Sequence, residues 1–224
     1  MLAIIVITMK SLFNSYKKYF LNKQFLISVA LSLVLLVGSL VINFYAGNYA
    51  TRKESNPVND MILDNIPVYD VDVAFIYGFG FFLLFVLILC LLKPQKIPFV
   101  LKATALFVLV RSMFITLTHI GPFPSHLIIN YSSNILKKFT FGGDLFFSGH
   151  TGMPFLMSLI FWDNKYFRIL FAATAVFFGI VVLMGHIHYS IDVLAAFFIT
   201  YAIYHIAIKL FKEDWRLFKE DFSQ

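Results

Sequence analysis

Six long runs of this sequence are apolar and almost free of charged residues, and this restricts the fold more than any other feature. A helix needs about 20 residues to cross the ~30 Å hydrocarbon core of a bilayer. The runs are Phe25–Tyr45, Val73–Leu92, Ala103–Thr118, Leu145–Trp162, Ile169–Gly185 and Tyr189–Ile208. We therefore predict an all-α, polytopic membrane protein built as a six-transmembrane-helix bundle.

The composition of the 224 residues excludes most soluble classes. Hydrophobic residues make up 60% of the chain and charged residues only 13%, whereas a soluble domain carries about 25% charged residues to cover its surface. Disordered chains, collagens and coiled coils are excluded for the same reason. The single cysteine, Cys90, excludes an intramolecular disulfide framework.

The two ends of the chain are predicted to be amphipathic helices that lie in the headgroup layer. Aromatic and aliphatic residues recur on one face of each end, and the alternative is that both ends are solvated tails. The predicted parts are a cytoplasmic amphipathic interfacial segment, a six-span membrane domain and a cytoplasmic amphipathic tail, at residues 1–24, 25–208 and 209–224.

Basic residues in the short loops predict the orientation of the chain in the membrane. Thirteen of the 18 Lys and Arg residues fall on the side of the two termini, four fall on the other side, and Arg111 lies inside a predicted span. Both termini are therefore expected to face the cytoplasm. The net charge of +6 is a topology signal, and no nucleic-acid partner is expected. The acidic loop that contains Asp60 is expected to be solvated.

The few ionisable residues at membrane depth are predicted to gather at the exoplasmic surface. Such residues are costly in a bilayer and are functional candidates by default. This topology brings together the predicted ends of four segments, with the side chains of Arg111, His150, His186, His188 and Asp192. A transporter or channel would use similar residues, but would spread them across the depth of the membrane.

Spacing predicts which of these residues interact. His188 and Asp192 are four apart, so on a helix they share a face and can form a hydrogen bond. His186 lies two residues before His188 and points elsewhere, which argues against a metal site. Ser148, Gly149 and His150 open another span, where free helix N–H groups suit a phosphate. His150, beside these N–H groups, is predicted to pass a proton to or from an ester oxygen.

Two blocks of the sequence resemble the signature blocks of sphingomyelin synthases, a branch of the type-2 phosphatidic acid phosphatase superfamily. They read GDLFFSGHT at residues 143–151 and HIHYSIDV at residues 186–193. The resemblance covers roughly residues 105–205. The arginine motifs of the phosphatases are absent, because Lys102 is nine residues before Arg111 and position 182 is valine. Ile187 and Ser190 depart from the synthase pattern.

The resemblance implies a membrane lipid phosphotransferase of sphingolipid metabolism that moves a phospho-headgroup from a glycerophospholipid to a ceramide-like lipid alcohol. His188 would be the nucleophile and form a phosphohistidine, Asp192 would orient it, and His150 would be the acid and base. Ser148, Gly149 and Arg111 would bind the phosphate. Support is expected from Asp144, His186 and Tyr189.

The resemblance implies neither a metal nor a cofactor. A lipid phosphatase or phospholipase C-type hydrolase, with water as acceptor, remains the alternative. The expected partners are the membrane phospholipid donor and the lipid-alcohol acceptor, and a homo-oligomer is left open.

Overall fold

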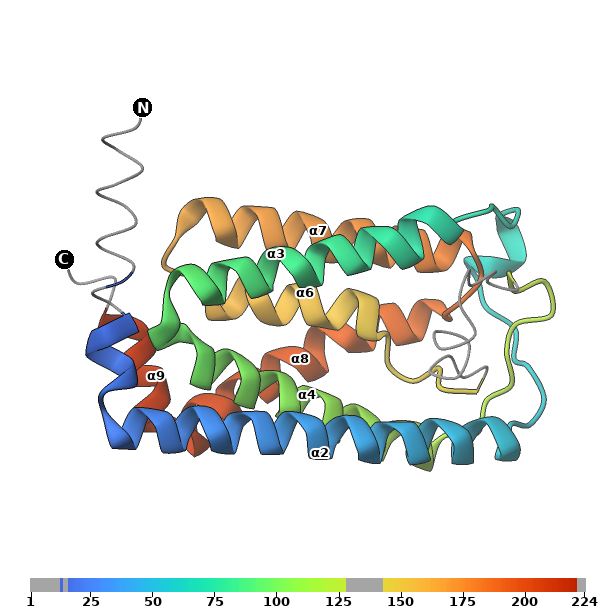
Figure 1. The fold of residues 1–224 in the computed structure, drawn as a ribbon. Helices are drawn as coiled ribbons and strands as arrows, with labels where there is room; N and C mark the ends of the chain where they lie inside the picture. The colour runs from blue at the N-terminus through green and yellow to red at the C-terminus, as the bar shows by residue number, and fades with distance from the viewer. Residues whose placement is uncertain (1–12, 14–15, 128–142, 221–224) are drawn as a thin grey trace.

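The computed structural model describes residues 13, 16–127 and 143–220, and every regular element within them is helical. The long helices are labelled in Figure 1. Their bounds are α2 (Lys23–Lys53), α3 (Phe79–Leu92), α4 (Ile97–Leu117), α6 (Gly149–Ile160), α7 (Lys165–Met184), α8 (Ser190–Leu210) and α9 (Lys212–Lys219). Short helical turns are η1 (Leu63–Asn65), η2 (Ala74–Gly78) and η3 (Pro94–Lys96).

Five helical stretches in the described residues are long and apolar enough to cross a membrane. They are Lys23–Lys53, Ala74–Leu92, Pro94–Leu117, Lys165–Met184 and Ser190–Leu210. The helix in the remaining predicted span, α6, has 12 residues and is not among them. An integral membrane protein is thus supported, and the sixth span stays a prediction.

The helix α6 is shorter than predicted because a polar cap starts it late and the chain turns at its other end before the next helix. The Ser148 hydroxyl accepts a hydrogen bond from the Thr151 N–H, which starts the helix at Gly149. At the other end the chain turns, and the side chain of Asn164 caps the first turn of α7. Residues 145–148 therefore form non-helical backbone instead of the predicted first turn.

Helix α2 packs mainly against α4. Its buried face repeats every seven residues, at Phe25, Ser32, Ser39 and Ala46, so the buried positions follow a heptad. Small side chains let the two backbones approach closely, as is usual between membrane helices. The other faces of α2 are exposed and apolar, as expected for a helix that faces lipid on most of its surface.

Aromatic rings fill the core between α3, α4, α6, α7 and α8. Phe107, Phe147, Phe171 and Phe178 are each at most 1% exposed. The helices cross closely at Gly152, where an added Cβ would lie 2.7 Å from the Phe107 ring and 2.9 Å from the Thr200 hydroxyl. This packing fixes α6 between α4 and α8.

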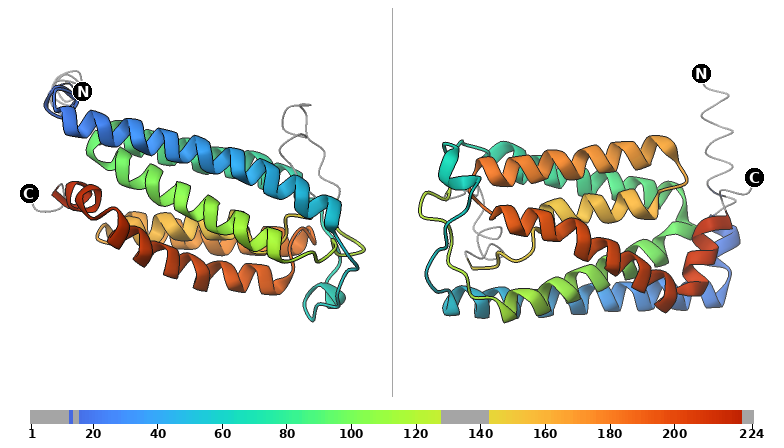
Figure 2. Two further views of the ribbon diagram at one scale, coloured as in Figure 1. Left: turned by 90° about the horizontal axis from the view of Figure 1, so that it is seen from below. Right: turned by 180° about the vertical axis from the view of Figure 1, so that it is seen from behind.

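Different connections and helix ends lie at the two ends of the bundle (Figure 2). At one end lie the start of α2, the turn η3, the connection between α6 and α7, and α9. At the other end, which we call the loop end, lie the connections 54–73, 118–127, 143–148 and 185–189. The described parts of both chain ends are therefore at the same end of the bundle.

Helix α9 packs its apolar face against the protein. Phe218 is fully buried and contacts the rings of Phe99 and Phe161. Asp214 forms an ion pair with Lys102 of α4 at 2.5 Å. Residues 1–12 of the predicted N-terminal interfacial helix, including Leu12, lie outside the described residues, as does Phe222 of the tail. The interfacial position of both ends stays a prediction.

Candidate active site

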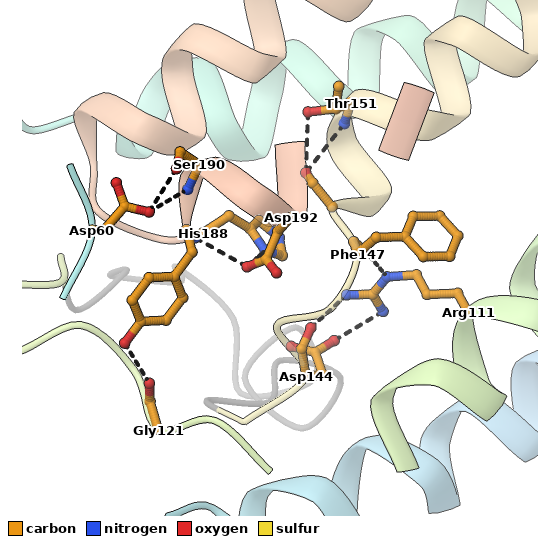
Figure 3. Close-up of polar contacts among 11 residues, drawn as sticks. Asp60, Arg111, Gly121, Asp144, Phe147, Thr151, His188, Ser190 and Asp192 are labelled. Carbon is orange, nitrogen blue, oxygen red and sulfur yellow. Dashed lines mark hydrogen bonds and ion pairs between the residues drawn. The ribbon is translucent and has the colours of Figure 1, made fainter. Parts of the chain in front are cut away.

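The structure brings several of the predicted site residues together, among them Arg111, His188 and Asp192 (Figure 3). Arg111 lies in the second half of α4, and Asp144 and Ser148 lie in the connection before α6. His188 lies in the connection between α7 and α8, and Asp192 lies in the first turn of α8. Segments from three parts of the chain thus surround one region.

The hydrogen bond predicted from the spacing of His188 and Asp192 is present. The Nδ1 of His188 lies 3.4 Å from Oδ2 of Asp192, and the two residues are 5% and 0% exposed. The same oxygen accepts a hydrogen bond from the Tyr189 N–H at 3.0 Å. The carboxylate is therefore held by the helix start and fixed against the imidazole, and Nε2 is the nitrogen of His188 that remains for chemistry.

A backbone hydrogen bond joins the two signature blocks directly. The Ser148 N–H donates to the carbonyl oxygen of Asp192 at 3.2 Å. Its hydroxyl oxygen accepts from the N–H and the hydroxyl of Thr151, and Ser148 is 0% exposed. The structure thus gives Ser148 a helix-capping role. Its predicted contact with phosphate remains untested.

Arg111 holds the connection before α6 in place. Its Nε donates to the Phe147 carbonyl at 2.8 Å, and one Nη donates to the Asp144 carbonyl at 2.6 Å. The other Nη forms an ion pair with the Asp144 carboxylate at 3.1 Å. An added Cβ at Gly149 would lie 3.4 Å from Nε, so the guanidinium lies beside the start of α6.

Asp144 supports the site through this ion pair. Burial raises the pKa of the Asp144 carboxyl above its ordinary value, while the charges of Arg111 and His188 act in the opposite direction. Asp144 therefore belongs to the site through its contacts with Arg111.

His150 packs among aromatic rings near the start of α6. Its ring centroid lies 3.9 Å from that of Phe75 and 4.1 Å from that of Phe79. Phe75 belongs to the π-helical turn η2, a type of irregularity that is frequent at functional sites. The structure records no hydrogen bond between His150 and His188 among the residues it describes.

His186 points to a different partner from His188, as the spacing predicts. Its Nδ1 lies 2.8 Å from the Ser125 hydroxyl, and its ring packs edge-on against Phe123. The backbone φ of His186 is 50°, in the left-handed region that non-glycine residues rarely adopt. His186 therefore packs against the connection 118–127, and the described contacts do not link it to Asp192.

Asp60 is not among the residues predicted for the site, and the expectation that it is solvated is wrong. Asp60 is 7% exposed and accepts hydrogen bonds from both the N–H and the hydroxyl of Ser190. Beside it, the Tyr189 hydroxyl donates to the Gly121 carbonyl at 2.8 Å. No local sequence signal marks these contacts, because the partners are 130 and 68 residues apart.

Lys102 lies far from this region. Its ammonium is buried at the α9 end, bound to Asp214 and to the Ser28 hydroxyl. It therefore cannot take the place of the lysine that the phosphatase motif puts before its arginine.

Comparison with known proteins gives one match, to part of the chain. Residues 142–209 match the family model described as PAP2 superfamily C-terminal. The matched segment contains α6, α7, nearly all of α8 and both histidine blocks. No curated protein and no solved structure matches the chain. This segment, about a third of the chain, is thus similar to the C-terminal part of the type-2 phosphatidic acid phosphatase superfamily.

Proposed function

We propose that this protein transfers a phospho-headgroup between membrane lipids, from a glycerophospholipid to a lipid alcohol such as ceramide. The superfamily match suggests a lipid phosphatase or phosphotransferase. The observation that carries the finer proposal is the buried His188–Asp192 pair, in which the carboxylate fixes one ring nitrogen and leaves Nε2 as the nucleophile.

In the first step, His188 Nε2 attacks the phosphorus of the donor phospholipid. A P–N bond forms, and the bond from phosphorus to the diacylglycerol oxygen breaks. The departing oxygen takes a proton from His150, so diacylglycerol leaves neutral. Asp192 stabilises the positive charge that develops on the His188 ring during this attack.

In the second step, the hydroxyl of the acceptor lipid gives its proton to His150, and its oxygen attacks the same phosphorus. The P–N bond breaks, which restores His188 and leaves the headgroup on the acceptor. Charge on the phosphoryl oxygens is stabilised by the N–H groups at the start of α6, at Gly149 and His150, and by Arg111. Arg111 uses three of its five N–H donors in the described contacts, which leaves donors for the substrate.

Hydrolysis is the second candidate, because the superfamily that residues 142–209 match is named after a phosphatase. Water would then replace the lipid alcohol in the second step, with the same three residues at work. Both reactions take place at the exoplasmic surface in this proposal, with both termini in the cytoplasm. Transfer uses two membrane lipids, whereas hydrolysis uses one membrane lipid and water.

Incubation of the purified protein with headgroup-labelled phospholipid, with and without ceramide, separates the two reactions. Transfer predicts that label appears in a new lipid only when ceramide is present. Soluble label in both samples would refute transfer and support hydrolysis.

Variants of the three proposed catalytic residues test the mechanism in the same assay. His188→Ala, His150→Ala and Asp192→Ala should each abolish turnover while the protein still folds in detergent. His205→Ala, on the same helix α8 but 13 residues beyond Asp192, is the matched control and should stay active. Full activity of any of the first three variants would remove that residue from the mechanism.

A further inference from the structure

The carboxylate of Asp60 joins the starts of two helices at the loop end. Its Oδ2 accepts from the Ser190 N–H at 2.7 Å and from the Ser190 hydroxyl at 2.8 Å. Its Oδ1 accepts from the N–H groups of Ile62 and Leu63, at 2.9 and 3.1 Å. Four donors on one carboxylate, at the first turns of η1 and α8, form a strong and directional link.

The link falls between the two residues of the proposed catalytic pair. Ser190 is the first residue of α8, two positions after His188 and two before Asp192. Any rotation of the first turn of α8 would therefore change the approach of the Asp192 carboxylate to the His188 ring. Figure 3 shows Asp60 on the side of Ser190 away from Arg111 and Asp144.

The residue between His188 and Ser190 is fixed by the same connection. Tyr189 is 1% exposed, and its hydroxyl accepts from the Val58 N–H at 3.3 Å while it donates to the Gly121 carbonyl. Residues 58–60 thus contact both positions that follow the nucleophile. These contacts restrain the backbone of the pair from an exposed loop, of which the Asp60 side chain is the buried part.

Asp60 is ionised at neutral pH. Burial acts to raise the pKa of this carboxyl, but the hydrogen bonds from Ser190, Leu63 and Ile62 outweigh it and hold the pKa below its ordinary value. The carboxylate form, which can accept all four hydrogen bonds, is therefore the form present when the enzyme works.

We propose that Asp60 is a positioning residue for His188, which it orients through Ser190 and the first turn of α8. Asp60 touches neither the substrate nor the reacting nitrogen. The inference rests on the proposed function, because His188 is the nucleophile there. It adds a residue of the first connection, outside the segment matched to the superfamily, to the machinery of the reaction.

Asp60→Asn and Ser190→Ala test the proposal in the full-length protein. The amide that replaces the carboxylate in Asp60→Asn would direct an N–H group toward donors, whereas Ser190→Ala removes only one of the four hydrogen bonds. Asp70→Asn is the matched control, since Asp70 is an exposed aspartate of the same connection that accepts from the Asp72 N–H. Turnover of headgroup-labelled phospholipid is measured under conditions in which circular dichroism shows that every variant is folded.

Asp60→Asn should lower kcat about 10- to 100-fold, because a small misplacement of a catalytic group costs that much, and should leave KM within about 2-fold. Ser190→Ala should lower kcat less, and Asp70→Asn should match the wild type. A residue with a purely structural role would change the melting temperature and leave kcat of the folded protein unchanged. That result in Asp60→Asn would overturn the proposal. If Asp60→Asn does not fold, wild-type kcat in Ser190→Ala overturns it instead.

Amide hydrogen exchange across residues 188–192 distinguishes a failure of the positioning role of Asp60 from a failure of the proposed function. If the wild type turns over no phospholipid, the proposed function fails, and exchange alone then decides whether Asp60 orders this segment. Faster exchange in Asp60→Asn than in Asp70→Asn supports the positioning role. Equal exchange in the two variants refutes it.

Discussion

Replacing Arg111 by alanine and Asp144 by asparagine should destabilise the protein to very different degrees. The two side chains form one ion pair, so a view based on that pair alone predicts similar losses. In the structure, however, two of the three guanidinium hydrogen bonds go to the backbone carbonyls of Asp144 and Phe147. Only the third goes to the Asp144 carboxylate.

The structure sets the expected size of each loss. Arg111→Ala removes all three bonds and leaves the Asp144 carboxylate partly buried without its cation, which should cost about 3–5 kcal/mol. Asp144→Asn keeps both hydrogen bonds from Arg111 to the backbone and offers a neutral acceptor for the third. We therefore expect a loss of about 1 kcal/mol in the free energy of unfolding. In a chain of this size 1 kcal/mol corresponds to roughly 2–4 °C in Tm.

Thermal unfolding in detergent, followed by circular dichroism, measures both losses. Arg111→Ala should lower Tm by about 6–20 °C and Asp144→Asn by about 2–4 °C. The double variant should be more stable than Arg111→Ala, since it no longer holds an uncompensated carboxylate. Equal losses in the two single variants would refute the view that Arg111 acts mainly through the backbone of the connection.

Three further predictions concern other parts of the fold. Gly152→Ala should destabilise by about 1–3 kcal/mol, because the added Cβ would overlap a phenylalanine ring of α4; Gly80→Ala, with open space around its Cβ, should leave Tm unchanged. Lys102→Met should cost about 3–5 kcal/mol by leaving Asp214 buried without its cation, and a wild-type Tm would show that the pair contributes nothing. The pKa of Asp60 is lowered from 3.8, so its ionised form stabilises the fold above about pH 4 and this contribution is lost as the pH falls through the lowered value. The Tm difference between wild type and Asp60→Asn should therefore shrink from pH 7 to pH 3, and a constant difference would contradict the linkage.

Local patterns in the sequence predict much of this architecture. Apolar runs locate the helices, and the four-residue spacing of His188 and Asp192 predicts their hydrogen bond. The same reasoning separates His186 from this pair, and the structure gives His186 a different partner, Ser125. The outcome agrees although α8 begins only at Ser190 and His186 has a φ of 50°, so neither histidine lies on the helix that the spacing argument assumed.

Other features depend on contacts between distant segments, which a single sequence does not encode in any local pattern. Asp60 reads as one of several acids in a polar loop, yet it is buried against Ser190. Arg111 reads as a free cation for phosphate, yet it binds backbone carbonyls whose positions depend on the fold of residues 144–147. The apolar run at residues 145–162 does not distinguish helix from buried irregular backbone, so the 12-residue length of α6 could not be predicted from hydropathy.

The short length of α6 has a consequence for where a lipid headgroup must go. Helix α7 has 20 residues and follows the 12-residue α6 after a brief turn, so at 1.5 Å per residue α6 begins ~12 Å below the level at which α7 ends. Irregular backbone takes up the remaining depth, and such backbone survives beside lipid only when its polar groups are satisfied by protein. Arg111 satisfies two of those carbonyls. In the proposed function, a headgroup that reaches the first amides of α6 lies beneath the interface, while its acyl chains remain among those of the surrounding bilayer.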